Sequence, residues 1–140
     1  MQKLEWNESL ETGIVEIDIQ HQNLFNIFKV LSDAIDNGKS SMVIKYIIDE
    51  IGRYGQYHMT AEEGILKKYN LFSEKHTQEH EEFKNTVGKF REKYISTKDK
   101  VLAKEISEYL YTWVTNHIMK TDMEELGLLK VEFKRLGKTE

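Results

Sequence analysis

The sequence contains no cysteine and no proline, and each absence excludes a class of structure or site. Without cysteine there is no disulfide framework, no thiolate zinc site and no cysteine-ligated iron–sulfur cluster. Any metal must therefore be held by imidazole and carboxylate groups. Without proline, no helix is broken by a missing backbone donor. Because the 140 residues also hold few Asn-Gly or Asp-Gly hairpin signals, we expect an all-α fold.

The chain also lacks a basic surplus and a long apolar run. The net charge is −4 with both signs interspersed, and lysines and arginines do not cluster with aromatic residues, which argues against nucleic-acid binding. No stretch approaches the roughly 18 apolar residues of a membrane span, and the first residues lack the apolar run of a secretory signal. We therefore expect a cytoplasmic protein, with residues 1–140 forming one domain.

Four segments carry apolar residues at helical spacing. We expect helices at about 18–36, 41–69, 73–94 and 100–122. Asp18 and Ser73 are suitable N-cap residues, and Asn37-Gly38 is a typical helix stop. Four amphipathic helices with short connections predict an up-down-up-down antiparallel four-helix bundle.

Two terminal segments flank the predicted core of about residues 17–122. Residues 1–16 are expected to form an irregular arm, with candidate anchors at Leu4, Trp6, Leu10, Ile14 and Val15. Residues 123–140 keep a helical pattern that Gly127 interrupts. This C-terminal tail is either a short helix that packs on the bundle or a docking segment for a protein partner.

The predicted topology gathers all the histidines of the chain. The start of the first and third helices and the end of the second and fourth lie at one end of such a bundle. The histidines fall at these places and on the inner face of each helix: His21, His58, His76, His80 and His117. Five buried imidazoles would leave many polar groups unsatisfied without a metal. The sequence therefore predicts a metal site at this end.

Two short motifs add detail to this site. His58 and Glu62 are four residues apart, as are His76 and His80, so each pair shares one face of its helix. Taken singly, such a pair has ordinary explanations, since a histidine on an apolar face is usually a core or boundary residue and Glu62 could face solvent. The combination favours a single metal site.

Asp122 is a seventh candidate ligand, with an unfavourable spacing. It follows His117 by five residues, which is about 140° around an α-helix, so the two side chains do not share a face. Asp122 could equally be a helix-end charge. It joins the site only if the helix bends or unwinds at this point.

The number and type of candidate ligands indicate the metal. Seven nitrogen and oxygen ligands are too many for one tetrahedral zinc ion, and imidazole with carboxylate suits iron. Two octahedral ions offer twelve positions. Five histidines, two bridging carboxylates and a solvent-derived oxo or hydroxo bridge would fill all but one of them. The remaining position could take a small ligand such as O2.

These motifs resemble the hemerythrin family, specifically its single-domain bacterial members. The likeness runs through IDIQHQNLF around His21, HMTAEE from His58, HTQEH from His76 and WVTNHIMKTD up to Asp122, and it covers roughly residues 4–123. The family implies a non-haem di-iron centre that binds O2 reversibly.

The resemblance also implies a role for each candidate residue. One iron would be held by His76, His80 and His117, and the iron with the open position by His21 and His58. Glu62 and Asp122 would bridge the two ions. The apolar O2 pocket would be lined by Leu24, Met59, Trp113, Val114 and Ile118. Position 59 is commonly Phe in the family and is Met here, a more flexible side chain that bears on pocket access and oxidation rate.

Three functions are compatible with this reading. The first is an O2 carrier, store or scavenger without catalytic turnover, with a monomer favoured. The second is a sensing module for O2, redox state or nitric oxide that acts through a partner, with the tail as the contact. The third is a di-iron enzyme or iron-handling protein. Such enzymes repeat Glu-x-x-His in two helices, and no histidine here has Glu three residues before it.

Overall fold

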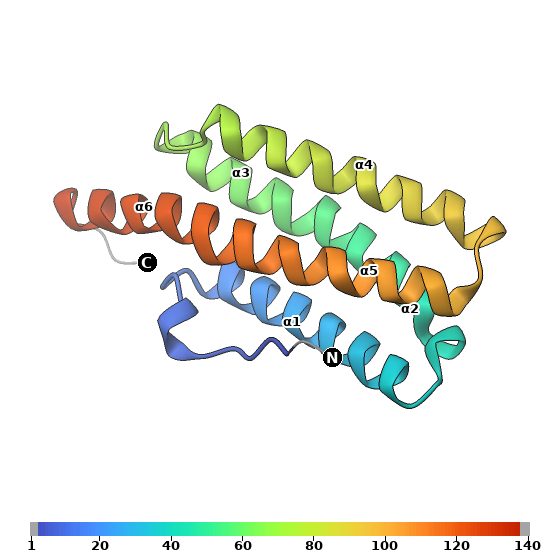
Figure 1. Cartoon of the computed structure of the whole chain (residues 1–140). Coiled ribbons are helices and arrows are strands. Elements are labelled where there is room, and N and C mark those ends of the chain that lie inside the picture. Colours follow the sequence, from blue (N-terminus) through green and yellow to red (C-terminus); the bar gives the residue numbers. More distant parts are fainter. Residues whose placement is uncertain (1–2, 138–140) are drawn as a thin grey trace.

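The computed structural model describes residues 3–137, and every regular element within that range is helical. In chain order the elements are η1 (Glu8–Leu10), α1 (Val15–Asp36), α2 (Ser40–Arg53), η2 (Tyr54–His58), α3 (Met59–Lys68), α4 (Glu74–Ser96), α5 (Asp99–Trp113), η3 (Val114–Asp122) and α6 (Met123–Arg135). α2, η2 and α3 form one continuous helix, as do α5, η3 and α6 (Figure 1). The four resulting helices alternate in direction, which confirms the predicted all-α four-helix bundle.

The turns between the helices follow local sequence signals. α1 ends at Asp36 and is capped by Asn37. The next residue, Gly38, has a φ of +68°, a left-handed conformation that glycine adopts without strain. Ser73 caps α4, because its hydroxyl accepts a hydrogen bond from the backbone N–H of His76 at 3.0 Å. Both the predicted helix stop and the predicted cap at Ser73 are confirmed.

Asp18, in contrast, does not cap the first helix. α1 begins at Val15, so Asp18 lies inside its first turn. The Asp18 carboxylate accepts hydrogen bonds from the backbone N–H and the hydroxyl of Thr12, both at 2.8 Å, and from the backbone N–H of Gly13 at 3.2 Å. The prediction of an N-cap at Asp18 was wrong because its side chain binds the preceding arm rather than the helix.

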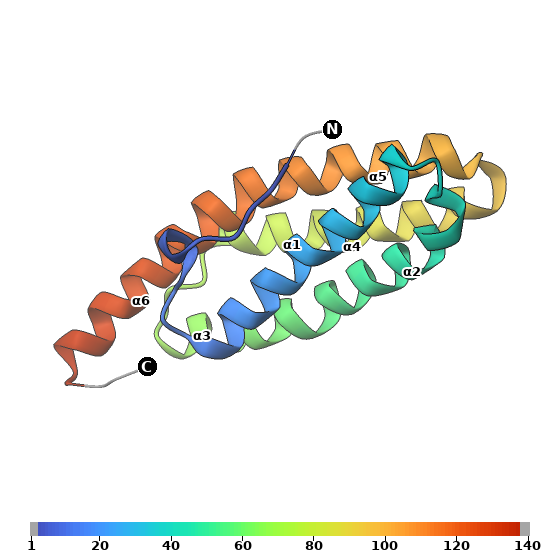
Figure 2. The same cartoon turned by 90° about the horizontal axis from the view of Figure 1, so that it is seen from below.

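The N-terminal arm packs along the bundle (Figure 2). Four of the five predicted anchors contact buried apolar residues, namely Leu4, Trp6, Leu10 and Ile14. The Trp6 ring meets the Phe25 ring edge to face, with centroids 5.4 Å apart. Val15 is 72% exposed, so its prediction as an anchor was wrong.

The inner faces of the helices form an apolar core that fills the bundle below the histidines. Its largest fully buried members include Phe28, Leu31, Ile47, Phe83 and Ile106, which come from α1, α2, α4 and α5. Each such side chain contributes about 1.5–3 kcal/mol of stability by leaving water. This core holds the four helices in a fixed register and thereby positions the polar residues at one end.

Two helices widen into π-helical turns where they reach the histidine end. η2 ends at His58, and η3 contains both His117 and Asp122. Hydrogen bonds in a π-helix run from residue i to residue i+5, so residues five apart stack one above the other. The wide turn of η3 therefore supplies the unwinding that lets Asp122 share a face with His117.

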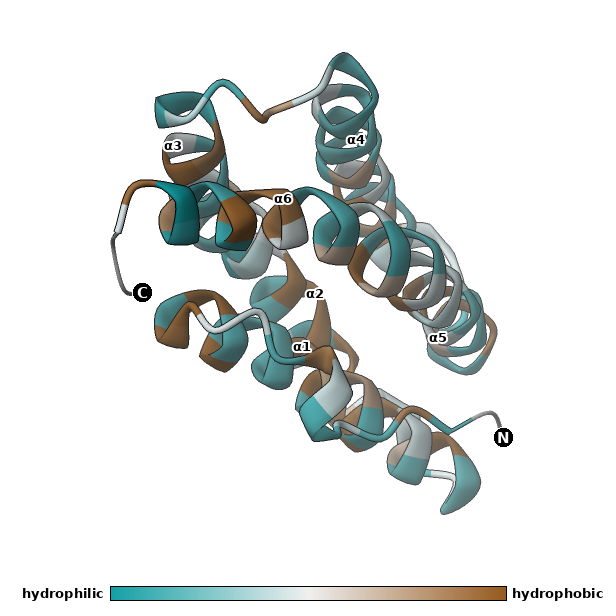
Figure 3. Cartoon of the chain, turned by 90° about the vertical axis from the view of Figure 1, so that its left-hand side faces the viewer, coloured by the Kyte–Doolittle hydropathy of each residue, from teal (hydrophilic) through white to brown (hydrophobic). Residues whose placement is uncertain are grey.

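The C-terminal tail is not a separate short helix. α6 continues directly from η3 and runs through Gly127 without interruption. Leu126 and Leu129 are buried in a second apolar cluster with Ile17 of α1 and Leu66 of α3. The end-on view shows α6 between α3 and α1 (Figure 3). The tail packs on the bundle, and the predicted boundary at residue 122 falls within a continuous helix.

Candidate metal centre

The seven candidate ligands lie together inside one end of the bundle. His21 comes from α1, His58 from η2, Glu62 from α3, two histidines from α4, and the last two residues from η3. None of the seven is more than 2% exposed. Sequence periodicity predicted this gathering for the histidines, and η3 brings Asp122 to the same place.

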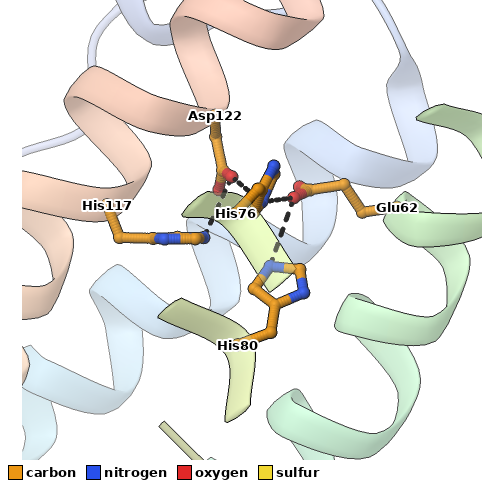
Figure 4. A group of neighbouring side chains, drawn as sticks. All are labelled: Glu62, His76, His80, His117 and Asp122. Carbon is orange, nitrogen blue, oxygen red and sulfur yellow. Dashed lines mark ion pairs between the residues drawn. The ribbon is translucent and has the colours of Figure 1, made fainter. Parts of the chain in front are cut away.

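The seven residues form two groups that share their carboxylates. One group contains His76, His80 and His117 with Glu62 and Asp122 (Figure 4), and in it one atom from each residue lies within 4.8 Å of the others. The second group contains His21 and His58 with the same two carboxylates, to the same limit. The division of the histidines is three against two.

Glu62 directs its two oxygens to different groups. Its Oε1 atom lies 2.8 Å from Nε2 of His76 and 3.5 Å from Nε2 of His80. Its Oε2 atom lies 3.1 Å from Nε2 of His58 and 3.6 Å from Nε2 of His21. A carboxylate in this arrangement faces both groups at once.

Asp122 also directs its two oxygens to different groups of histidines. Its Oδ1 atom lies 2.9 Å from Nε2 of His76 and 3.0 Å from Nε2 of His117, while Oδ2 lies 3.1 Å from Nε2 of His21. The two carboxylates therefore connect the two groups of histidines.

The atoms at the middle of the cluster lack hydrogen-bond partners within the described residues. Despite the short separations, none of these carboxylate oxygens and none of the five Nε2 atoms makes a hydrogen bond of acceptable geometry to any residue in the described part of the chain. Leaving one such buried atom unsatisfied costs about 1–3 kcal/mol. So many converging nitrogen and oxygen atoms match the donor set of a metal site.

The outer nitrogens of four histidines are held by a second layer of side chains that the sequence analysis missed. The Nδ1–H groups donate to oxygens at distances of 2.6–3.1 Å, in the pairs His58–Gln20, His76–Glu125, His80–Glu63 and His117–Glu79. An acceptor at Nδ1 fixes the tautomer in which the Nε2 lone pair is free for a metal. Three of the four acceptors are carboxylates, and all three serve the group of three histidines.

Glu125 contacts both His76 and the residue that caps its helix. Its carboxylate accepts hydrogen bonds from Nδ1 of His76 at 3.1 Å and from the hydroxyl and backbone N–H of Ser73, at 2.6 and 3.2 Å. Since the Ser73 hydroxyl also accepts from the backbone of His76, both ends of that histidine are held. Glu125 thus connects α6 to the metal centre.

We expect the substitution Glu125→Gln to weaken metal binding about 10–100-fold, the usual effect of removing an outer partner of a histidine ligand. The amide still fills the space, but it no longer accepts a charge-assisted hydrogen bond from His76. Competition with a metal chelator measures the change. The neighbouring Glu124 is exposed, so Glu124→Gln is the matched control and should bind metal as the natural chain does.

The charges at the centre stabilise one another without a metal. Burial lowers the pKa of His21 and His76, but interactions with Asp122 and Glu62 outweigh it and raise these pKa values to about 9 and about 11. Burial raises the pKa of Asp122, and nearby imidazoles outweigh it and bring the value to about 2. For Glu62 the same balance places the pKa well below its usual value. A cation would replace the protons on the imidazoles, so metal binding would release protons.

The residues predicted to line the O2 pocket all belong to the main apolar core. Leu24, Met59, Val114 and Ile118 have no exposed surface. Trp113 is 7% exposed, and its indole ring stacks on the His117 ring with centroids 3.9 Å apart. Trp113 thus places one member of this apolar group in direct contact with a candidate ligand.

The sequence matches a known protein family. The sequence model described as "Hemerythrin HHE cation binding domain" matches residues 12–129. The chain belongs to the hemerythrin family. This confirms the predicted resemblance, and the match extends past Met123, where the likeness seen in the sequence motifs ended.

Proteins related to this hemerythrin come from several organisms. A bacteriohemerythrin of Pseudomonas paraeruginosa is 32% identical over 139 residues, covering 99% of this chain and 89% of the relative. A bacteriohemerythrin of Clostridium acetobutylicum is 29% identical over 126 residues, covering 85% and 95%. A hemerythrin-like protein of Naegleria gruberi is 28% identical over 126 residues, covering 89% and 92%. Within the described residues, no helix is long and apolar enough to cross a membrane.

Proposed function

We propose that the seven buried side chains hold two iron ions, bridged by an oxo or hydroxo group, and that the loaded centre binds O2 reversibly without catalytic turnover. One observation carries this proposal above the others: Glu62 and Asp122 each direct one oxygen to each group of histidines. Carboxylates placed in this way are suited to bridge two ions. Imidazole and carboxylate donors together are a set that iron accepts.

The unequal division of histidines supports the binding of a small ligand. His76, His80 and His117 supply three donors to one ion, whereas His21 and His58 supply two to the other. Because both carboxylates would be shared, the ion held by His21 and His58 would have one protein donor fewer than the ion held by the three histidines. Its side of the centre is where a ligand would enter.

The surroundings of the centre favour reversible O2 binding over enzymatic turnover. Apolar residues at such a centre would keep water and protons away from bound O2. This would slow the loss of O2 as superoxide or peroxide, which leaves the irons oxidised. The paired Glu-x-x-His motif of di-iron carboxylate enzymes is absent from the sequence. We propose a monomeric cytoplasmic carrier, store or scavenger of O2, folded as one domain.

A sensing role is the second candidate, and one contact favours it. Glu125 joins α6 to His76, so a change at the metal could reach the C-terminal helix through a single side chain. A sensor would use this link to signal to a protein partner. Hydrogen exchange in α6 should then differ between the oxygenated and deoxygenated protein.

The function is tested by loading the protein with iron(II) under anaerobic conditions and then alternating O2 with inert gas. Visible absorption follows the centre. The proposal predicts a coloured form that appears under O2 and clears on purging through several cycles. Immediate and permanent oxidation at the first exposure would contradict reversible binding and favour a redox sensor or a role in peroxide or nitric oxide handling.

We expect Met59→Phe to slow the decay of the oxygenated form by about fivefold, which corresponds to a barrier change of about 1 kcal/mol. Met59 is fully buried, and a rigid phenyl ring leaves less room for water than a flexible thioether does. Visible absorption under O2 gives the decay rate. Met42 is 77% exposed, so Met42→Phe is the control. An unchanged rate in Met59→Phe would remove Met59 from the pocket.

A further inference from the structure

A layer of aromatic rings lies directly against the histidines on the core side of the centre. The Tyr54 ring stacks on the His58 ring, with centroids 4.7 Å apart and planes at 14°. Tyr54 also meets Phe83 edge to face at 5.3 Å, and Phe83 lies 4.7 Å from Trp113. Trp113 in turn stacks on His117. Tyr54 therefore belongs to the same layer as the predicted O2 pocket, although the sequence motifs did not point to it.

The Tyr54 hydroxyl is buried without a hydrogen-bond partner. The residue is 6% exposed, and within residues 3–137 its oxygen makes no hydrogen bond. The indole N–H of Trp113 is likewise without an acceptor in that range, and an indole cannot accept a hydrogen bond. Even if the indole donates to the phenol oxygen, the phenol O–H group still lacks an acceptor among the described residues. A buried donor in this state is costly, and the cost is removed if a ligand supplies the acceptor.

The phenol lies close to the charged centre of the site. Its ring stacks on His58, whose Nε2 atom lies 3.1 Å from Oε2 of Glu62. Among the other predicted pocket residues, Leu24, Val114 and Ile118 carry no polar side-chain atom. Tyr54 and Trp113 are the strong donors of this layer.

A surface cleft of about 220 Å³ is lined by Gln20, Tyr54, Tyr57 and His58, among others. The two stacked rings of Tyr54 and His58 therefore border this cleft. His58 belongs to the group of two histidines, the side on which the ligand is expected.

We propose that Tyr54 donates a hydrogen bond to the ligand that occupies the pocket, and that it selects for small ligands that carry negative charge, such as a linear triatomic anion. This inference rests on the proposed function, because it needs the loaded centre. Tyr54 acts as a binding residue for the ligand, and its ring continues to support His58 by stacking. Removing the hydroxyl alone separates these two roles.

The test uses azide as the probe and the oxidised, iron-loaded full-length protein. Visible absorption gives the azide dissociation constant for the natural chain, for Tyr54→Phe and for Tyr46→Phe. The first variant keeps the ring and loses only the hydroxyl, and the second removes a hydroxyl from a residue that is 52% exposed. We expect azide to bind about tenfold more weakly to Tyr54→Phe, as for a lost hydrogen bond to a charged group, and unchanged to Tyr46→Phe.

A second measurement needs no variant. The infrared stretching band of bound azide should shift between H2O and D2O in the natural chain if an O–H donor contacts it. Absence of the shift, or equal azide affinity in Tyr54→Phe with two irons bound, would overturn the inference while leaving the proposed function intact. Failure of the natural chain to load two irons would instead overturn the proposed function.

Discussion

Replacing Glu62 with glutamine is expected to abolish the binding of two metals. The side chain keeps its shape, but it loses its charge and one of the two acceptor oxygens that face the two groups of histidines. An amide nitrogen cannot replace an oxygen ligand, so the two ions lose a shared anion and repel each other more strongly. We expect the second ion to bind at least about 100-fold more weakly, a loss of about 2.7 kcal/mol. Metal analysis after gel filtration measures the stoichiometry.

The controls separate ligand loss from general damage. His58→Ala should reduce the stoichiometry in the same way, because it removes one of the two donors from the smaller group. Lys89 is exposed on α4, so Lys89→Ala should retain two metals. Two ions bound to Glu62→Gln with unchanged affinity would rule out Glu62 as a bridging ligand.

Metal loading at both sites is expected to raise the melting temperature by roughly 15–40 °C. The metal-free centre buries two carboxylates and five imidazoles whose inner atoms lack hydrogen bonds within the described residues. The unfolded chain has no preformed site, so metal binds mainly to the folded state and its binding free energy stabilises the fold. Free metal at about 1,000 times the dissociation constant adds about 4.1 kcal/mol per site. A change of 1 kcal/mol shifts the melting temperature of a chain of this size by about 2–5 °C.

Circular dichroism at the helical band, with and without metal, measures this shift. Glu62→Gln should lose most of the increase, whereas Glu124→Gln should keep it, because Glu124 is exposed. Equal melting temperatures for the loaded and metal-free natural protein would show that the metal contributes nothing to the fold, contrary to the proposed burial of the ions.

The parts of this structure that the sequence predicted are those with a periodic signal. Apolar residues at helical spacing located the four helices, and the same spacing placed His58, His76, His80 and their neighbours on inner faces. Because a bundle with short connections has few topologies, the gathering of histidines at one end followed directly. Composition alone excluded thiolate ligands.

The parts that could not be predicted depend on departures from the regular α-helix or on contacts between helices. The wide turn that brings Asp122 beneath His117 leaves no periodic pattern, because π-helical segments are short and rare. Asp18 is a residue type that often caps helices. Here its carboxylate instead accepts a hydrogen bond from the N-terminal arm, a contact that no local sequence pattern indicates.

The outer partners of the histidines were hidden for a different reason. Glu63, Glu79 and Glu125 stand among many acidic residues on helix surfaces, where most charges face solvent. Only the packing of neighbouring helices distinguishes these three from the others. Their positions one to three residues from a ligand residue are the one sequence signal that could have identified them.

The central claim is that the seven side chains hold two irons, and X-ray diffraction from crystals of the iron-loaded protein tests it most directly. Anomalous scattering at the iron absorption edge locates the ions without reference to any assumed ligand. We predict two peaks, one in contact with His76, His80 and His117, the other with His21 and His58, and both with Glu62 and Asp122. A single peak, or two peaks that do not share the carboxylates, would contradict the proposed centre.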